Sequence, residues 1–387
     1  MTQPPPDAAD LELSVVMPCL NEAETVAICA RKAREAMARL GIRGEVLVAD
    51  NGSTDGSQKL AEAEGARVVP VPVKGYGAAL QAGCEAAAGR YLIMGDSDDS
   101  YDFSNLGPFL ERLRTGDDLV MGSRFRGGIR PGAMPWHHRW IGNPVLTGIL
   151  NLLFRAGISD AHCGMRGFSK DAFRRMSLKT TGMEFASEMI IKAAKLHMRI
   201  SEIPIVLHVA GRTRPPHLRS FRDGWRHLRF MLIYSPAYLY SLPGWIAFLT
   251  GSALMLWLAP GARYIGGVML DYHLLTAAGA LMILGMQVLL IGRFAKVYAV
   301  VEGFETDDGQ RFNLERGLMI GLAVFLAGLL VDGWLLVHYL RHGFTYPNAI
   351  RPALLGATLM ILGAQGVAGS FFLGMMQLNR RRPQVVG

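Results

Sequence analysis

The chain has 387 residues, half of them hydrophobic, and a net charge of +8 at pH 7. This length allows more than one domain, and the four scattered cysteines lack the spacing of a metal site or a redox motif. No DNA- or RNA-binding motif accompanies the positive charge, so we do not expect a nucleic acid partner. Residues 1–12 are mostly polar and proline-rich, unlike a signal peptide, and we expect them to be a disordered segment.

Residues 13–211 alternate short apolar runs with amphipathic stretches. The predicted strands are Leu13–Pro18, Glu45–Asp50, Ala66–Val71, Tyr91–Met94 and Leu119–Gly122. Helices are predicted over about Glu22–Leu40 and Thr54–Glu64. Strands separated by helices of this length form a mostly parallel sheet covered on both faces, so the predicted fold class is α/β and Rossmann-like. Ligands of such sheets bind beyond the carboxyl ends of the strands.

From about residue 237 long apolar runs dominate, and four of them reach the roughly 20 residues needed to cross a bilayer. We therefore predict a transmembrane domain over 237–387, with spans at Tyr238–Leu258, Met269–Gly292, Gly317–Leu340 and Pro352–Leu378. Residues 212–236 interleave arginines with aromatic and aliphatic residues at a spacing of three to four. This pattern is typical of a basic amphipathic helix in the membrane interface, or of a helix packed on the head.

An even number of spans returns the chain to the side of the membrane on which it started. The soluble head and the C-terminal Arg380–Arg382 then share one side, which the positive-inside rule makes cytoplasmic. The basic loop Arg341–Arg351 on the other side is a contrary signal. We expect an integral protein of the inner or plasma membrane.

The sequence Gly95-Asp96-Ser97-Asp98-Asp99 directly follows the predicted strand Tyr91–Met94. Two carboxylates at a strand end can reach one divalent cation, and hard cations such as Mg²⁺ take oxygen ligands that they often share with substrate phosphates. The pattern therefore predicts a metal–diphosphate site at Asp96 and Asp98. An ordinary surface turn is the alternative, because Asp and Ser are common turn residues.

Polar residues also follow the first two strands. Pro18 ends the first strand, and Asn21-Glu22 opens the next helix, where a carboxylate can accept ribose hydroxyls or simply favour the helix N-terminus. Asp50 ends the second strand and either accepts a base N–H or stabilises a turn.

Two further segments flank predicted helices. Ser53 or Thr54 is expected to cap the helix that follows Asp50. Lys74-Gly75-Tyr76-Gly77 forms a flexible loop that enters a helix, and such an N-terminus suits phosphate or sugar oxygens.

Four motifs occur in order: Val16-Met-Pro18-Cys-Leu-Asn21-Glu22, Val48-Ala-Asp50-Asn-Gly-Ser-Thr-Asp55, Lys74-Gly75-Tyr-Gly77 and Gly95-Asp96-Ser-Asp98. Together they resemble glycosyltransferase family 2, whose heads have the GT-A fold. A fifth run, Asp160-Ala-His-Cys-Gly164-Met-Arg166-Gly-Phe168, looks like the polyprenyl-phosphate sugar synthases, including dolichol-phosphate mannose synthase. The resemblance covers about residues 13–211 and implies a GT-A catalytic domain there.

The resemblance implies a nucleotide site formed by Pro18, Asn21, Glu22, Asp50, Lys74, Gly75 and Asp96. It implies catalytic and metal-binding roles for Asp96 and Asp98, with Mg²⁺ or Mn²⁺ as a Lewis acid on the leaving diphosphate. Many family members carry a glutamine two places after the second Asp, where this chain has Ser100. The third protein ligand of the metal therefore stays open.

On the acceptor side the resemblance implies a lipid phosphate held by Arg124 (also a catalytic candidate), Arg139 and Asn143, with Arg212 or Arg214 closing from the juxtamembrane side. Arginine's planar fork suits phosphate. The alternative is that Arg139 and the later arginines coat the membrane surface.

A pair of acids lies further along the chain. Glu184 and Glu188 share one face of a predicted helix and are candidates for a base or for sugar contacts, together with Arg166. A structural ion pair is the alternative. His137, His138 and His162 have no metal-ligand spacing.

The implied reaction is inverting transfer of a hexose from a nucleotide diphosphate sugar to polyprenyl phosphate, giving polyprenyl-monophosphate-hexose. One alternative acceptor is a diacylglycerol or glycan hydroxyl, with Glu188 as base. An alternative of another class is a lipid flippase or transport element with a regulatory head. The expected partners are the nucleotide sugar, polyprenyl phosphate and membrane lipids, and a homo-oligomer through the transmembrane domain is a further option.

Overall fold

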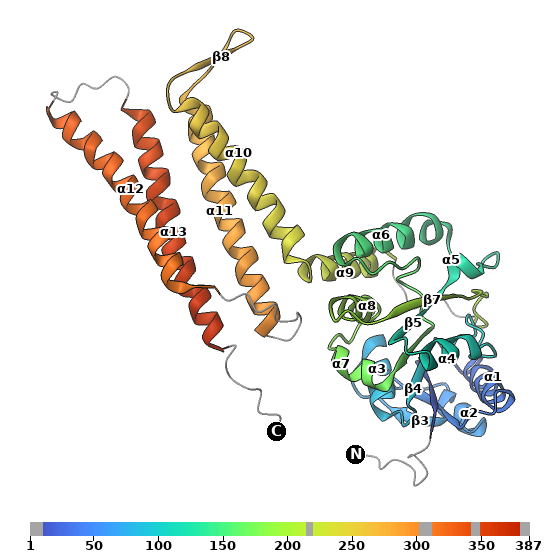
Figure 1. Ribbon diagram of the computed structural model, residues 1–387. Helices are drawn as coiled ribbons and strands as arrows, with labels where there is room; N and C mark the ends of the chain where they lie inside the picture. The colour runs from blue at the N-terminus through green and yellow to red at the C-terminus, as the bar shows by residue number, and fades with distance from the viewer. Residues whose placement is uncertain (1–10, 214–219, 302–311, 342–348, 380–387) are drawn as a thin grey trace. The chain divides into compact units, whose positions relative to one another are not determined.

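A computed structural model describes residues 11–213, 220–301, 312–341 and 349–379 of the chain (Figure 1). The chain divides into two compact units, with the boundary between Met231 and Leu232. The first unit holds a mixed sheet and its helices, and the second holds long apolar helices.

The sheet of the first unit has seven strands in the order β3-β2-β1-β4-β6-β5-β7. Neighbouring strands are parallel except at β6, which runs antiparallel to β4 and β5. The strands are β1 (Leu13–Cys19), β2 (Gly44–Asp50), β3 (Arg67–Pro70), β4 (Tyr91–Met94), β5 (Leu119–Ser123), β6 (Arg166–Ser169) and β7 (Ile200–Pro204). The predicted mostly parallel α/β sheet is confirmed.

Helices cover both faces of the sheet because successive residues of its central strands are apolar and point to opposite sides. Val15 and Met17 of β1 belong to a core shared with α1 (Val26–Arg39) and α4 (Gly107–Arg114). Val16 points to the other face, where a Cβ added to Gly83 of α3 (Tyr76–Ala86) would lie 2.6 Å from its side chain. The missing Cβ therefore lets α3 pack directly on the sheet.

Two helices begin later than predicted. The helix α1 starts at Val26 rather than Glu22, because Asn21 adopts a left-handed φ of 58° and the chain turns first. The helix α2 (Ser57–Ala63) has Gly56 as its N-cap residue, so the expected cap at Ser53 or Thr54 is wrong. The carboxylate of Asp55 accepts hydrogen bonds from the amide and the hydroxyl of Ser57 and organises this turn instead.

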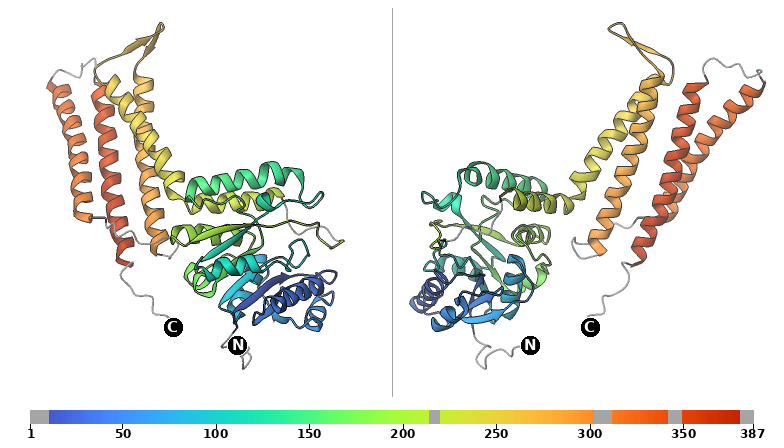
Figure 2. Two further views of the ribbon diagram at one scale, coloured as in Figure 1. Left: turned by 45° about the vertical axis from the view of Figure 1, so that its right-hand side comes forward. Right: turned by 180° about the vertical axis from the view of Figure 1, so that it is seen from behind.

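Several helices of the first unit follow β5, and some of them leave apolar side chains exposed. These are α5 (Arg124–Gly127), the π-helical turn η2 (His138–Gly142), α6 (Asn143–Phe154), α7 (Lys170–Met176), α8 (Phe185–Lys195) and α9 (Ser220–Ile233). The helices α6 and α9 lie side by side in each view (Figures 1 and 2). Large apolar residues exposed on or just before them include Trp136, Trp140, Ile141, Val145, Leu152, Phe221 and Trp225.

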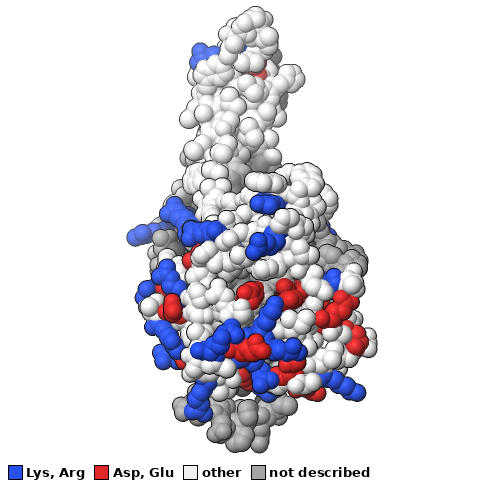
Figure 3. All heavy atoms as spheres, turned by 90° about the vertical axis from the view of Figure 1, so that its right-hand side faces the viewer, with Lys and Arg blue, Asp and Glu red and all other residues white. Residues whose placement is uncertain are grey.

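The second unit contains η3 (Ala237–Ser241), α10 (Leu242–Leu258), α11 (Tyr272–Val301), α12 (Leu314–Arg341) and α13 (Ile350–Asn379). Among the described residues, four segments are long and apolar enough to cross a membrane: Tyr238–Leu258, Tyr272–Val301, Leu314–Arg341 and Ile350–Gln377. The second of these segments begins at Tyr272 rather than at the predicted Met269. Met269 instead belongs to a hairpin of β8 (Arg263–Ile265) and β9 (Val268–Leu270). The visible face of this unit carries few charged residues, whereas the head carries many (Figure 3).

Close approach of backbones holds the long helices together in pairs. A Cβ added to Gly251 of α10 would lie 2.6 Å from the carbonyl oxygen of Ala278 in α11. In the same way, a Cβ on Gly328 of α12 would lie 2.6 Å from the carbonyl oxygen of Gly356 in α13. Small residues at such contacts are typical of helices that pack in a bilayer, where dispersion rather than the hydrophobic effect drives association.

Candidate active site

The carboxylate pair lies beyond the carboxyl end of β4. The hydroxyl of Tyr76, at the start of α3, donates a hydrogen bond of 2.9 Å to Oδ1 of Asp96. A Cβ added to Gly164 would come within 2.7 Å of the other oxygen, so a larger residue there would displace the carboxylate. Asp98 is 8% exposed and accepts a hydrogen bond from the amide of Ser100. Asp96 is thus held by residues from separate parts of the chain, and Asp98 by its own loop.

Negative charge is concentrated at this pair. Burial and the neighbouring Asp98 raise the pKa of Asp96 to about 6, while Tyr76, Arg212 and Arg124 oppose the rise. A divalent cation relieves such repulsion, and one or two carboxylates together with substrate phosphates are a usual ligand set for Mg²⁺. The donor set therefore fits a divalent cation. Among the described residues no group of three His, Cys, Asp or Glu could hold a metal ion without further ligands.

Arg212 bridges two acids of the site. Its Nη1 lies 2.6 Å from Oε1 of Glu22, and its Nη2 lies 3.1 Å from Oδ2 of Asp98. Glu22 is 6% exposed, and its amide donates to the hydroxyl of Ser57. The structure therefore places Arg212 against the proposed donor-side acids, although the sequence assigned it to the acceptor. Arg214 lies outside the described residues.

Asp50 is occupied by its own loop. Its carboxylate accepts hydrogen bonds from the amides of Gly52 and Ser53 and one of 2.6 Å from Nε2 of Gln58. It is 2% exposed, which matches the turn-stabilising alternative for this residue.

Two other predicted donor-side residues join neighbouring loops. The side-chain oxygen of Asn21 accepts the amide N–H of Thr54 at 2.8 Å. The carbonyl oxygen of Pro18 accepts the hydroxyl of Ser97 at 2.7 Å. The ends of β1, β2 and β4 are thereby tied together around the carboxylate pair.

The loop before α3 is closed by another segment. Gly75 has a φ of 141°, and a Cβ there would lie 2.2 Å from the carbonyl oxygen of Thr181. That carbonyl accepts the amide N–H of Ala78, so this N–H of the first helical turn is already used. Lys74 donates to the carbonyl oxygen of Asn51. The glycines therefore serve close backbone approach, and the N-terminus of α3 is less open to a phosphate than the sequence predicts.

Arg124 forms a buried pair with Asp160. Its Nε and Nη2 donate to the two carboxylate oxygens at 2.7 and 2.8 Å, and its amide donates to the same carboxylate at 3.0 Å. Arg124 is 7% exposed and Asp160 is fully buried. The third guanidinium nitrogen, Nη1, makes no hydrogen bond with the residues that the structure describes, so it is the one left for a ligand.

Arg139 and Asn143 lie on η2 and α6, apart from that pair. The guanidinium of Arg139 sits over the ring of Trp140, 5.2 Å from its centroid, and the amide of Asn143 contacts the sulfur of Met134. Within the described part of the chain, no hydrogen bond or ion pair joins either residue to Arg124 or Asp160.

Arg166 is fully buried and holds the turn that contains Asp160. It donates to the carbonyl oxygens of Cys163, Ala186 and Ala161 at 2.9, 2.6 and 3.0 Å. Its neighbours are thus backbone groups, not the acids with which the sequence grouped it. The turn from Asp160 to Gly164 is rigid as a result.

Glu188 and Glu184 differ in their surroundings. Glu188 is fully buried, pairs with Lys192 at 2.9 Å, and accepts hydrogen bonds from the amides of Lys179 and Thr180. These contacts hold the segment that closes the loop before α3, as expected from the structural alternative. Glu184 is the N-cap residue of α8 and lies against Gly182.

The sequence did not reveal the roles of Tyr76 and Asp160 as partners of Asp96 and Arg124. Tyr76 stands between the two glycines of the third motif, and Asp160 opens the fifth, so both positions carried a signal. Which side chain each one contacts depends on the crossovers between strands.

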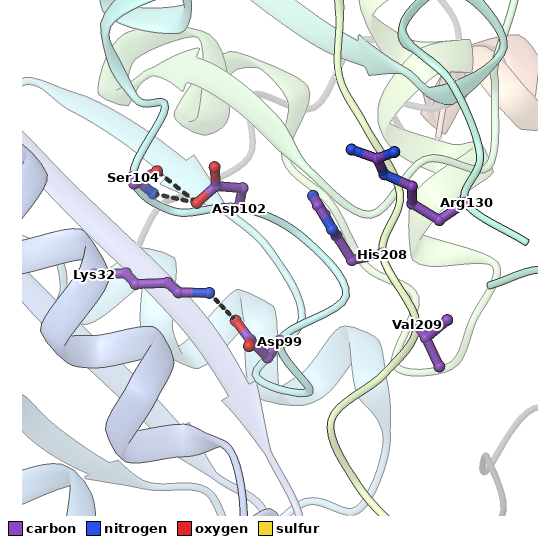
Figure 4. Close-up of a pocket in the computed structure, with 7 residues that line it drawn as sticks. All are labelled: Lys32, Asp99, Asp102, Ser104, Arg130, His208 and Val209. Carbon is purple, nitrogen blue, oxygen red and sulfur yellow. Dashed lines mark hydrogen bonds and ion pairs between the residues drawn. The ribbon is translucent and has the colours of Figure 1, made fainter.

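A pocket lies beside the carboxylate pair. Lys32 of α1 donates to Asp99 at 2.7 Å on one side of it, and Arg130 and His208 face it from the other (Figure 4). Asp102, Ser104 and Val209 complete its lining, which includes none of the predicted site residues.

A mostly parallel sheet with strand-end carboxylates, followed by helices of membrane length, is typical of a membrane-associated protein that binds ligands beyond the carboxyl ends of its strands. Comparison with known families gives the particular class. Residues 14–177 match Glycosyl transferase family 2, and residues 293–377 match the Glycosyltransferase family 2 C-terminal transmembrane region. The chain belongs to glycosyl transferase family 2 and is a glycosyltransferase, as the sequence motifs predict.

The chain is also similar to individual proteins of known name. The low-salt glycan biosynthesis hexosyltransferase Agl6 of Haloferax volcanii is 42% identical over 94% of this chain and 89% of its own length. A dolichyl-phosphate hexose transferase of the same organism is 31% identical over 42% of this chain and 69% of its own. The glucosyl-3-phosphoglycerate synthase of Mycobacterium tuberculosis, crystallised with Mn²⁺, UDP and phosphoglyceric acid, is 24% identical, with a TM-score of 0.43 over 58% of this chain and 76% of that chain.

Proposed function

We propose that this glycosyltransferase moves a hexose from a nucleotide diphosphate sugar to polyprenyl phosphate with inversion at the anomeric carbon. The observation that carries the proposal is the gathering of two carboxylates, Asp96 and Asp98, with two arginines: Arg212 contacts Asp98 at 3.1 Å, and the charges of Arg212 and Arg124 both act on the buried Asp96. A metal–diphosphate site and a cationic site for an anionic acceptor then lie at one edge of the sheet. The hexose and the lipid phosphate agree with the names of the two Haloferax relatives.

The donor is proposed to bind at the ends of β1, β2 and β4, with Pro18, Asn21, Glu22, Asp50, Lys74 and Gly75 around the nucleotide. Asp96 and Asp98 would hold Mg²⁺ or Mn²⁺, which supplies Lewis-acid stabilisation of the leaving diphosphate. Tyr76 and Gly164 orient Asp96, while the amide of Ser100 orients Asp98. These contacts place the carboxylates before the substrate arrives.

The acceptor phosphate is proposed to bind at Arg124. An oxygen of the lipid phosphate attacks the anomeric carbon, a new carbon–oxygen bond forms, and the bond from that carbon to the donor's diphosphate breaks. The acceptor is already anionic at neutral pH, so no general base is required. The buried ion pair of Glu188 with Lys192 agrees with this, since Glu188 is not exposed to take a proton from a hydroxyl acceptor.

A lipid acceptor also accounts for the apolar surface of the head. Trp140 and Val145 are 69% and 53% exposed near α6, and Phe221 and Trp225 are 94% and 58% exposed on α9. Aromatic residues with neighbouring arginines are typical of helices that lie in a membrane interface. We propose that this surface rests on the membrane, with the head in the cytoplasm, and so brings the site to the phosphate of a membrane lipid.

The test is turnover by the full-length protein in detergent or nanodiscs. It is incubated with single nucleotide sugars and polyprenyl phosphate, with and without Mn²⁺, and the lipid products are identified by mass spectrometry. The expected product is a polyprenyl-monophosphate-hexose that forms only with the metal. Transfer to diacylglycerol but not to polyprenyl phosphate would reject the proposed acceptor.

A further inference from the structure

His162 lies on the turn that joins the two halves of the proposed site. Two residues before it, Asp160 holds Arg124, and two residues after it, Gly164 lies against Asp96. Arg166 donates to the carbonyl oxygens on either side of His162, those of Ala161 and Cys163. The backbone at His162 is therefore fixed between the donor carboxylate and the acceptor arginine.

The imidazole of His162 has no hydrogen-bonded role in the structure. Neither ring nitrogen has a hydrogen-bond partner among the described residues, and both nitrogens are shielded from solvent. A buried polar group without a partner is unusual and calls for an explanation, such as a ligand. The residue as a whole keeps some exposed surface, and a turn about the Cβ–Cγ bond, which has a broad minimum, can present a nitrogen to a ligand.

Helix α9 supports this ring from one side. The rings of His162 and His227 meet edge to face with centroids 4.7 Å apart, and His227 in turn forms a hydrogen bond of 2.8 Å with the hydroxyl of Ser187. Burial and the positive charges of Arg124 and Arg166 lower the pKa of His162 well below its usual value. The ring is therefore neutral and carries one N–H donor.

A phosphate acceptor needs more donors than Arg124 supplies. Two guanidinium nitrogens of Arg124 donate to Asp160, which also neutralises its charge. A phosphate monoester has three oxygens to satisfy, and a buried acceptor left without a donor destabilises the complex. His162 lies two residues from Asp160, the partner of Arg124, and has a donor that nothing described in the chain uses.

We propose that the N–H of His162 donates a hydrogen bond to the phosphate of the acceptor, beside Nη1 of Arg124. This inference rests on the proposed function and adds a residue that touches the acceptor. The donor's diphosphate is the other phosphate that could reach the ring. Its position at Asp96 and Asp98, beyond Gly164, favours the acceptor as the source.

The experiment measures binding of each substrate separately in the full-length protein. Farnesyl phosphate serves as the isoprenyl monophosphate probe and UDP with Mn²⁺ as the donor probe, both by calorimetry. His162→Phe keeps a flat ring without a donor, and His162→Gln restores an N–H group. We expect farnesyl phosphate to bind about tenfold more weakly to His162→Phe, the loss typical of one hydrogen bond to a charged group, with much of the affinity recovered in His162→Gln. UDP binding should be unchanged in both variants and also shows that they are folded.

The control is His197→Asn, at an exposed residue after α8 whose left-handed φ of 52° suits asparagine. It should bind both probes like the wild type. Equal binding of farnesyl phosphate by wild type and His162→Phe would overturn the inference, as would a parallel loss of UDP binding. If the wild type itself binds no isoprenyl phosphate, the proposed acceptor is wrong, whatever His162 does.

Discussion

Nη2 of Arg212 lies 3.1 Å from Oδ2 of Asp98, and the same guanidinium reaches Glu22 through Nη1. A single positive charge thus contacts two acids at the place proposed for a divalent cation. Arg212 and the cation compete for the carboxylate of Asp98, because both must approach its oxygens to contact distance.

Removing Arg212 should therefore strengthen metal binding in the absence of nucleotide. In Arg212→Ala, a tenfold gain in Mn²⁺ affinity would raise the metal-induced shift in Tm by about 2–4 °C over that of the wild type. The measurement is thermal unfolding with and without MnCl₂. Arg130→Ala, at the neighbouring pocket, should show the wild-type shift. Equal shifts in Arg212→Ala and wild type would show that no such competition exists.

Asp98→Asn should abolish most of the metal-dependent turnover. The amide keeps the volume of the side chain but removes the negative charge, and Lewis-acid stabilisation is worth several kcal/mol. We expect kcat to fall by about two to three orders of magnitude. Asp99→Asn is the matched control, because the adjacent Asp99 pairs with Lys32 instead. Similar losses in both variants would argue against a specific role for Asp98.

Gly164→Ala should disturb the carboxylate of Asp96 without unfolding the protein. The new Cβ would lie 2.7 Å from Oδ2 of Asp96 and 3.1 Å from the ring of Tyr101, so these side chains must shift. We expect a fall in kcat with a small change in Tm. Gly148→Ala in α6, where a Cβ meets nothing within 4 Å, should keep wild-type activity. Full activity of Gly164→Ala would show that the orientation of Asp96 is not critical.

Glu188→Gln should act on stability rather than on the chemical step. Replacing the buried carboxylate leaves the ammonium of Lys192 without its charge partner, which destabilises by about 3 kcal/mol or more. The expected result is a lower Tm with an unchanged pH profile of kcat in the folded fraction. A variant that folds normally and loses activity only with a hydroxyl acceptor would instead revive Glu188 as a base.

The buried His227 should make stability depend on pH. Burial lowers its pKa to about 4 from an ordinary value near 6.5, so the folded protein binds fewer protons than the unfolded chain between these values. The stability that the neutral His227 contributes is fully present above pH 6.5 and is lost as the pH falls toward 4. The free energy of unfolding falls by up to about 1.4 kcal/mol per pH unit in this range. Between pH 7.5 and 4.5, the Tm of the wild type should fall more steeply than that of His227→Gln. Parallel curves would contradict this assignment.

Much of the head could be predicted from local patterns. The strands β1, β2, β4 and β5 are short apolar runs, and polar residues follow their carboxyl ends because the chain returns to the surface there. The helix starts were less predictable. Asn21 and Gly56 take left-handed conformations, so α1 and α2 begin later in the chain than predicted. The side chain of Asn21 is held by Thr54, which belongs to a distant loop.

The sequence by itself determined the α/β head, the four helices of membrane length and the acids Asp96 and Asp98 at a strand end, because periodicity and composition are local properties. Only the tertiary structure decided the partners of those groups. It placed Arg212 on Asp98, Asp160 on Arg124, Tyr76 on Asp96 and Lys192 on Glu188. Most of these contacts join residues far apart in the chain, and their geometry follows from strand order and helix packing, which set where each side chain meets its neighbour.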